Sequence, residues 1–203
     1  MKLTLLILCR LIAGFALMVL VHGCATLDNY LPASPQQISA GDESRLGAAV
    51  ERRLLQMLGG LYQDEELSAL MTRMGKKVGI DISIADKSSA AVYPLPGERV
   101  VLTRGLLMEM ESLDQLETLL KNAASMSHAA MNNIDSRAMT KEVQGFLSAK
   151  GPSYDPDSAE IRIARHFASL PCEEACLYEA MHRLNGQGTP LPEPVLALQA
   201  AKP

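Results

Sequence analysis

The pattern of apolar and polar positions between residues 95 and 131 predicts a strand that leads into a long helix. Residues 100–103 form a short, mostly apolar run that predicts a strand, and Gly105 marks a turn after it. Apolar side chains then recur at helical spacing on one stripe: Leu113, Leu116, Leu120, Ala123 and Ala130. Ser112 and Gln115 predict a capping box at the start of this helix, which we expect to be central and buried.

Two amphipathic helices are predicted before this strand. The first runs from residue 41 to about residue 58 and is ended by Gly59 and Gly60. Its apolar stripe consists of Leu46, Val50 and Leu54, and its arginines expected in solvent are Arg45, Arg52 and Arg53. The second helix covers residues 65–78, with Asp64 as its N-cap and Gly79 as its stop.

Three strands are predicted between these helices and the central one. Residues 80–85 alternate between apolar and polar side chains, which is typical of a half-buried strand. Residues 90–95 and 99–103 form the other two, and Pro94 and Pro96 restrict that part of the sheet to an edge or a bulge. The fold class is therefore α+β: a mostly helical domain with a small three-stranded sheet beside a central helix.

After the central helix, Ser136 is expected to cap a helix that runs to about residue 150. Further helices are predicted over residues 158–170 and from Pro171 to Leu184. Residues 187–203 form a Pro-rich tail. The tail either packs across the domain through its apolar side chains or stays disordered; these side chains are Val195, Leu196 and Leu198.

The N-terminus has the features of a targeting segment. Lys2 and Arg10 bracket an apolar run from Leu3 to Val21, and Cys24 follows a small residue, Gly23. This ending resembles a bacterial lipobox, in which the Cys is lipidated and becomes N-terminal after cleavage. The alternative is a single transmembrane anchor, since about 20 apolar residues can span a bilayer. The charge inside the run and the Gly-Cys at its end favour the signal peptide.

Cleavage before Cys24 divides the chain into a signal peptide (1–23), a tether (24–40), a folded domain (41–186) and the tail (187–203). Loss of two of the 19 basic residues with the signal peptide leaves 17 against 23 acidic residues, a net charge of about −6. This acidic balance argues against a nucleic-acid partner. The lipid anchor makes the membrane a partner.

Two cysteines remain in the mature chain besides Cys24. Cys172 and Cys176 lie four residues apart, and helix geometry places their Cα atoms about 6 Å apart. This separation is within the range of a disulfide, which an oxidising periplasm would favour. The alternatives are two free buried thiols or a metal site that also uses His166 or His182.

The order of these elements is similar to that of the HtpX/BepA type of zinc metallopeptidase, metallopeptidase family forty-eight. Residues 91–97 stand where that family has an N-A-F-A-L-P-G-G motif, and Gly105–Leu107 match the G-L-L after its apolar strand. Residues 115–121 fall on the approach to the family's active-site helix. The likeness covers roughly residues 62–184 and implies a gluzincin-like (zincin) domain.

The resemblance also implies that the family's chemistry is lost. Its H-E-x-x-H segment corresponds to residues 122–126, where two imidazoles one turn apart would hold zinc and the Glu would deprotonate its bound water. Here Asn122 and Met126 replace the imidazoles, and Ala123 replaces the base. Glu160 is the nearest equivalent of the family's third ligand, a Glu; the alternative is a carboxylate that compensates the dipole of its own helix. No cofactor is therefore expected, although active relatives bind zinc.

A peptide-binding edge remains possible without a metal. In gluzincins an edge strand beside the catalytic helix pairs with extended substrate, and residues Val100, Val101, Leu102 and Thr103 are the candidates for that edge. Their backbone groups would bind peptide by strand addition. The alternative is an edge that a loop or a partner merely covers.

Three functions follow from these features. The first is a catalytically inactive, metallopeptidase-like lipoprotein on the periplasmic face of the outer membrane, which binds unfolded outer-membrane proteins or an active paralogous peptidase in envelope quality control. The second is an active zinc metalloendopeptidase with a non-standard metal site made by His128, Glu160 and His166. The third is a purely structural envelope lipoprotein. Ala25 after the lipidated Cys fits the outer membrane, by analogy with other lipoproteins.

Overall fold

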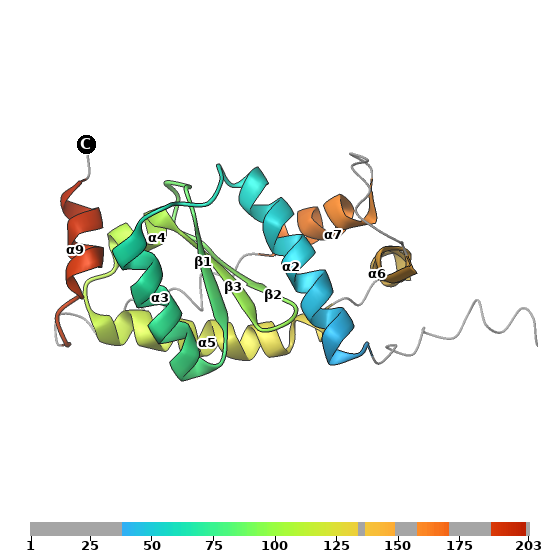
Figure 1. The fold of residues 1–203 in the computed structure, drawn as a ribbon, viewed down its shortest axis with the longest axis horizontal. Helices are drawn as coiled ribbons and strands as arrows, with labels where there is room; N and C mark the ends of the chain where they lie inside the picture. Colours follow the sequence, from blue (N-terminus) through green and yellow to red (C-terminus); the bar gives the residue numbers. More distant parts are fainter. Residues whose placement is uncertain (1–37, 134–136, 149–157, 171–187, 202–203) are drawn as a thin grey trace, which may run out of the picture. The chain divides into compact units, whose positions relative to one another are not determined.

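The computed structural model of the 203-residue chain describes residues 38–133, 137–148, 158–170 and 188–201 (Figure 1). All of them belong to the second of two units, which begins at Gln37. The described residues form seven α-helices, one 3-10 helix and three strands, so the α+β class and the three-stranded sheet are confirmed. The elements are α2 (Ala40–Met57), α3 (Glu65–Val78), β1 (Asp81–Ala85), β2 (Val92–Leu95), β3 (Arg99–Thr103), α4 (Arg104–Glu109), α5 (Leu113–His128), η1 (Ala130–Asn133), α6 (Arg137–Ser148), α7 (Ala159–Ala168) and α9 (Glu193–Ala200).

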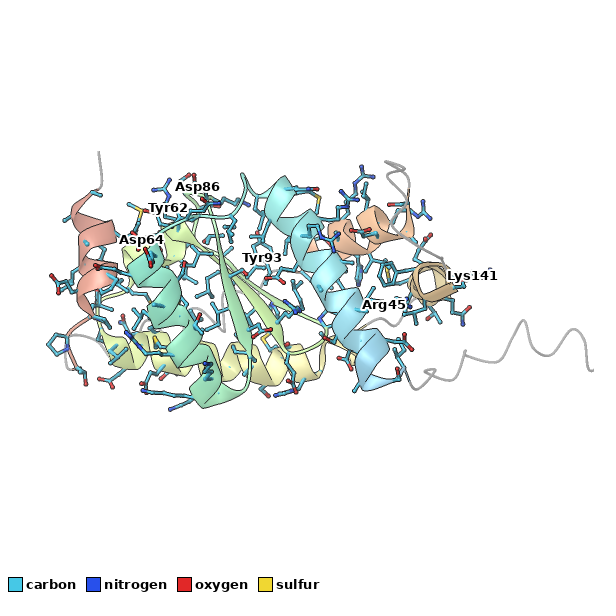
Figure 2. All side chains as sticks on the ribbon, viewed as in Figure 1. Arg45, Tyr62, Asp64, Asp86, Tyr93 and Lys141 are labelled. Atoms are coloured by element: carbon cyan, nitrogen blue, oxygen red, sulfur yellow. The ribbon has the colours of Figure 1, made fainter. Side chains whose placement is uncertain are left out.

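The two helices before the sheet begin and end close to the predicted residues, because local signals decide their ends. Ser39 caps α2, and its Oγ accepts a hydrogen bond from the Asp42 amide at 3.1 Å, so α2 begins slightly earlier than predicted. Asp64 caps α3 through a 2.8 Å bond from the Leu67 amide, at the helix start marked in Figure 2. Gly79, at φ 76°, ends α3 in the left-handed conformation that glycine adopts without strain.

The sheet is mixed, with strand order β1-β3-β2. β1 runs parallel to β3, with Ile82 opposite Val100, and β2 runs antiparallel to β3, with Tyr93 opposite Val101. β3 therefore lies between the other two strands, as Figure 1 shows.

The prediction that residues 100–103 form a peptide-binding edge is wrong, because β3 is not an edge strand. On one side of β3 the Asp81 amide donates to the Glu98 carbonyl at 2.8 Å, and on the other the Thr103 amide donates to the Ala91 carbonyl at 3.1 Å. Val100, Val101, Leu102 and Thr103 are all fully buried. Strand order depends on the whole sheet and is not written in one strand, although a run of apolar residues without alternation is typical of a strand covered on both faces.

The prediction for Pro94 is confirmed, because β2 is an edge strand. The hydrogen bond from Thr103 to Ala91 shows which backbone groups of β2 point toward β3. The N–H and C=O of Tyr93 point toward β3, and the backbone groups of Pro94 point away from it. A proline at this position costs no ladder hydrogen bond, since its missing N–H would point outward.

Helices cover both faces of the sheet. One face, with Ile82, Ile84, Val92, Val100 and Leu102, packs against α3, α4, α5 and α9, which we call the first layer. The other face, with Ala85, Tyr93, Leu95 and Val101, packs against α2, α6 and α7, which we call the second layer. Alternate side chains of each strand thus enter two different cores.

The turn predicted around Gly105 is instead the short helix α4. Thr103 Oγ1 accepts a hydrogen bond from the Leu106 amide at 3.3 Å and so caps the helix directly at the end of β3. A Cβ on residue 105 would lie 1.9 Å from the Ser88 carbonyl oxygen, so this close approach requires glycine. Gly105, which suggested a turn, therefore permits the start of α4 to pack closely against the backbone of Ser88.

The C-terminal tail contains a helix that packs on the domain. Val195 of α9 is fully buried and Leu198 nearly so, whereas Leu196 remains 47% exposed. The Gln199 amide donates to the carbonyls of Leu107 (3.1 Å) and Met110 (2.7 Å) at the end of α4. Of the two alternatives for the tail, packing across the domain is the one observed.

Several predictions concern residues outside the described ranges. They are the signal peptide, lipidation of Cys24, the tether before residue 38, the Ser136 cap, the helix from Pro171 to Leu184, and the Cys172–Cys176 disulfide with its alternatives. None of the helices within the described ranges is both long and apolar enough to cross a membrane.

Candidate functional site

The site suggested by the sequence lies on α5, whose start is set by the predicted capping box. Ser112 Oγ accepts from the Gln115 amide, and Gln115 Oε1 accepts from the Ser112 amide, both at 3.3 Å. Gln115 Oε1 also accepts from the Glu111 amide at 2.7 Å. These hydrogen bonds satisfy the backbone amides at the start of α5 and fix the residue at which the helix begins.

One face of α5 packs against β2, β3 and α3. Its buried residues are Leu116, Leu119, Leu120, Ala123, Ala124 and Ser127. The Ser127 hydroxyl is fully buried and donates to the Leu95 carbonyl at 2.6 Å, which joins the end of the helix to the end of β2.

Asn122 and Met126 lie one turn apart on one flank of α5, and both are half-buried. The opposite flank faces α3, because Glu117 lies 3.6 Å from Lys77 of α3. At about 100° per residue, Asn122 and Met126 are roughly 140° to 180° around the helix from Glu117. They therefore share the side of α5 that is turned away from α3.

Ala123, which stands at the motif position of the base, is fully buried in the apolar core of the first layer. Its methyl group accepts no proton, and its burial leaves it no contact with solvent. Asn122 offers an amide and Met126 a thioether. Zinc prefers imidazole or carboxylate to both of them. These residues do not fit a zinc site.

Glu160 is in the second layer. It lies in the first turn of α7, is buried, and its Oε1 accepts a hydrogen bond from Arg53 Nε of α2 at 2.9 Å. Met126 packs against the first layer, so the structure does not bring Glu160 and the α5 positions together. The prediction that Arg53 is solvated is wrong, since its side chain is only 12% exposed.

The alternative metal site is also not assembled. His128 lies at the end of α5, half exposed, with Nδ1 3.9 Å from Glu98 Oε1. His166 lies on α7, and its ring is edge-on to the Phe167 ring, with the two ring centroids 5.6 Å apart. In the part of the chain that the structure describes, no three His, Cys, Asp or Glu side chains are placed to hold a metal ion.

A second buried carboxylate was missed in the sequence. Glu51 of α2 accepts hydrogen bonds from Ser83 Oγ of β1 and Arg99 Nη1 of β3, both at 2.5 Å. Asp81 lies 3.5 Å from the same guanidinium. The signal was available, because Glu51 is four residues after buried Gly47 and three before Leu54, on the apolar stripe.

The two charge pairs therefore hold helices and strands together. Glu51 ties α2 to the sheet, and Glu160 ties α7 to α2. Both carboxylates already accept hydrogen bonds from guanidinium groups, which leaves neither of them available as a general base without breaking its pair.

Comparison with protein-family models finds no match for this chain, and comparison with curated proteins finds none either. A family assignment therefore depends on the resemblance of roughly residues 62–184 alone.

Proposed function

We propose that this chain is a catalytically inactive, metallopeptidase-like lipoprotein. It is anchored by acylated Cys24 at the periplasmic face of the outer membrane and binds a peptide or a partner protein in envelope protein quality control. The expected partners are an unfolded outer-membrane protein or an active paralogous peptidase.

The order and packing of the elements support a gluzincin-like domain. The hairpin between β2 and β3 carries the L-P-G turn, the G-L-L residues open α4, and the capped helix α5 packs on β2 and β3. This is the order of elements that the resemblance implies.

The observation that carries the inactive assignment is the burial of Ala123. A catalytic base must reach a water molecule and a substrate, so it requires an open position. The motif position is instead filled by a fully buried methyl group among Leu119, Leu120 and Ala124. The carboxylate nearest in sequence to a third ligand, Glu160, is bound to Arg53 in the other layer.

Zinc content and peptidase activity test this proposal directly. Mature protein purified in detergent is analysed for zinc by elemental analysis, and casein hydrolysis is measured with and without a chelator. We expect no stoichiometric zinc and no chelator-sensitive hydrolysis. One zinc per chain together with hydrolysis that the chelator abolishes would overturn the inactive assignment.

The anchor is tested separately. Mass spectrometry of the mature N-terminus should find an acylated Cys24, and membrane fractionation should place the protein with the outer membrane. Cys24→Ala should accumulate as the unprocessed precursor. A chain that keeps its first 23 residues in the wild type would contradict the lipoprotein assignment.

A further inference from the structure

The two edges of the sheet differ in how much of their backbone is open. On β2, Pro94 lacks the outward N–H, and all four residues of the strand are buried. β2 therefore offers little for another strand to pair with. The other edge of the sheet is β1.

The C-terminal half of β1 is already paired. The Tyr62 amide donates to the Ile84 carbonyl at 2.8 Å, and the Asp86 amide donates to the Gly60 carbonyl at 2.9 Å. This short stretch runs antiparallel to β1, with Leu61 opposite Ala85. Tyr62 and Asp86 lie side by side at this end of the strand (Figure 2).

The N-terminal half of β1 is unpaired on its outer side. The hydrogen bond from Asp81 to Glu98 shows that the backbone N–H and C=O groups of residues 81 and 83 point toward β3. Those of Ile82 therefore point away from β3. The N–H and C=O of Ile82 have no hydrogen-bond partner among the described residues. The stretch opposite β1 stops at Tyr62 because the chain turns into α3, which Asp64 caps. In Figure 1, β1 runs between α3 and α2.

We propose that β1 binds a short extended segment of a partner polypeptide at Asp81–Ser83, antiparallel to β1 and in line with residues 60–62. One partner residue exchanges two backbone hydrogen bonds with Ile82. This inference rests on the proposed function, since it names the surface through which the binding occurs. It replaces residues 100–103, which the sheet uses internally.

The side chains around the open stretch favour a particular sequence in the partner. Directly opposed residues of an antiparallel pair place their side chains on the same face. The residue opposite Ile82 therefore lies beside a half-buried isoleucine on the first-layer face, where an apolar side chain fits. Its neighbours lie on the face of Asp81, whose carboxylate lies 3.5 Å from Arg99 Nη2 and is still 75% exposed, so that it also attracts a basic side chain from solvent. An apolar residue next to Lys or Arg fits best.

Ile82→Pro tests the proposal, with Ile82→Val as its matched control. The proline removes the outward N–H, whose loss breaks no hydrogen bond of the sheet, as at Pro94 on β2, and it also shortens the half-buried side chain. The valine shortens the side chain and keeps the N–H, and urea unfolding of both variants checks that the sheet stays intact. The probe is a labelled nine-residue peptide in which valine alternates with lysine and threonine. We expect Ile82→Pro to weaken binding about ten-fold or more and Ile82→Val to change it less than about two-fold.

Amide hydrogen exchange of the wild type gives a second measurement that needs no variant. Peptide binding should protect the Ile82 amide, whereas the Ser83 amide, which faces β3, should be protected before the peptide is added.

The outcomes separate this inference from the proposed function. Binding without protection at Ile82, or binding that Ile82→Pro leaves unchanged, overturns β1 as the surface and leaves the peptide-binding function in place. A wild-type protein that does not bind the peptide overturns the inference, while the zinc and hydrolysis measurements still decide the inactive assignment.

Discussion

The first and second layers cover the same three strands but are built from different chemistry. In the first layer, α3, α4, α5 and α9 meet the sheet through aliphatic side chains, and its ion pair between Lys77 and Glu117 lies at the surface. In the second layer, α2 carries two largely buried charges, Glu51 toward the sheet and Arg53 toward α7.

This difference shows where the chain uses its buried carboxylates. The helix that stands in the position of a catalytic helix belongs to the apolar layer, and its motif position 123 is a buried alanine. The buried carboxylates belong to the other layer and are bound by arginines. Charge is therefore used in this protein to join helices and strands, and we expect the two layers to respond differently to substitution.

The largest effect is expected where a charge is placed in the apolar layer. Ala123→Glu would bury an unpaired carboxylate in the first-layer core and should lower the free energy of unfolding by about 4 kcal/mol or prevent folding. Asn122→His and Met126→His, at half-buried positions, should each change it by about 1 kcal/mol or less. Urea unfolding followed by circular dichroism measures all three.

The same variants test whether position 123 is enclosed by the apolar core of the first layer. A folded Ala123→Glu protein of unchanged stability would show that position 123 faces open space. If the triple variant with Asn122→His and Met126→His then bound one zinc per chain, the first layer would contain a cleft that accepts the metal, and the contrast between the layers would be lost.

The next effect is expected from the buried pair of the second layer. Glu160→Ala removes the carboxylate that accepts a hydrogen bond from Arg53 in a largely buried site and should cost about 3 kcal/mol of unfolding free energy. Replacement of both residues, Arg53→Met with Glu160→Leu, should recover most of this loss. Lys77→Ala at the surface of the first layer is the matched control and should cost less than about 0.5 kcal/mol. Equal losses for Glu160→Ala and Lys77→Ala would contradict the comparison.

A smaller effect is expected from the glycine that lets α2 approach the sheet. A Cβ at Gly47 would lie 2.0 Å from the Pro96 carbonyl oxygen, so Gly47→Ala must shift α2 and should cost about 2 kcal/mol. Gly145 of α6 is the control, because among the described residues a Cβ there would meet only the Ala159 Cβ, at 3.9 Å. Gly145→Ala should raise stability by about 0.5 kcal/mol, since alanine favours the helix. Thermal unfolding of both variants compares them, and a neutral Gly47→Ala would refute the close approach.

The smallest effect is expected at the surface of the second layer. The pKa of the Glu142 carboxyl lies below its ordinary value of 4.5, mainly because Arg162 Nη2 donates to it at 2.6 Å; burial acts against this, and the charge of Arg162 adds to it. Because the folded pKa is the lower one, the pair stabilises the fold above the unfolded pKa, and this contribution is lost as the pH falls through the folded pKa.

Acidification should therefore destabilise the wild type slightly more than Glu142→Gln, whose side chain does not ionise. An NMR titration of the Glu142 carboxyl should give a midpoint below 4.5. A midpoint at or above that value, or identical pH profiles for the two proteins, would show that the pair does not form in solution.

Much of the fold was predictable because its determinants are local. The bounds of α3 follow from Asp64 and Gly79, which lie next to the helical turns that they cap. The start of α5 follows from Ser112 and Gln115. The buried stripe of α2 and the edge position of the strand with Pro94 follow from periodicity and from the missing N–H. Each of these signals acts within one or two turns of the chain.

The rest required the tertiary structure, since it joins residues that are distant in the sequence. Glu51 meets Arg99 across 48 residues, and Arg53 meets Glu160 across 107, so no local pattern could show which partners these charges have, although the place of Glu51 on the apolar stripe indicated its burial. The order β1-β3-β2 likewise depends on distant pairing, since β3 pairs with parallel β1 on one side and with antiparallel β2 on the other. The sequence alone determined which segments are helices and strands and which side chains avoid water. Only the packing of those segments decided which strand is central, which edge is open and which charges neutralise each other, because hydrophobic burial has no direction and does not select among partners.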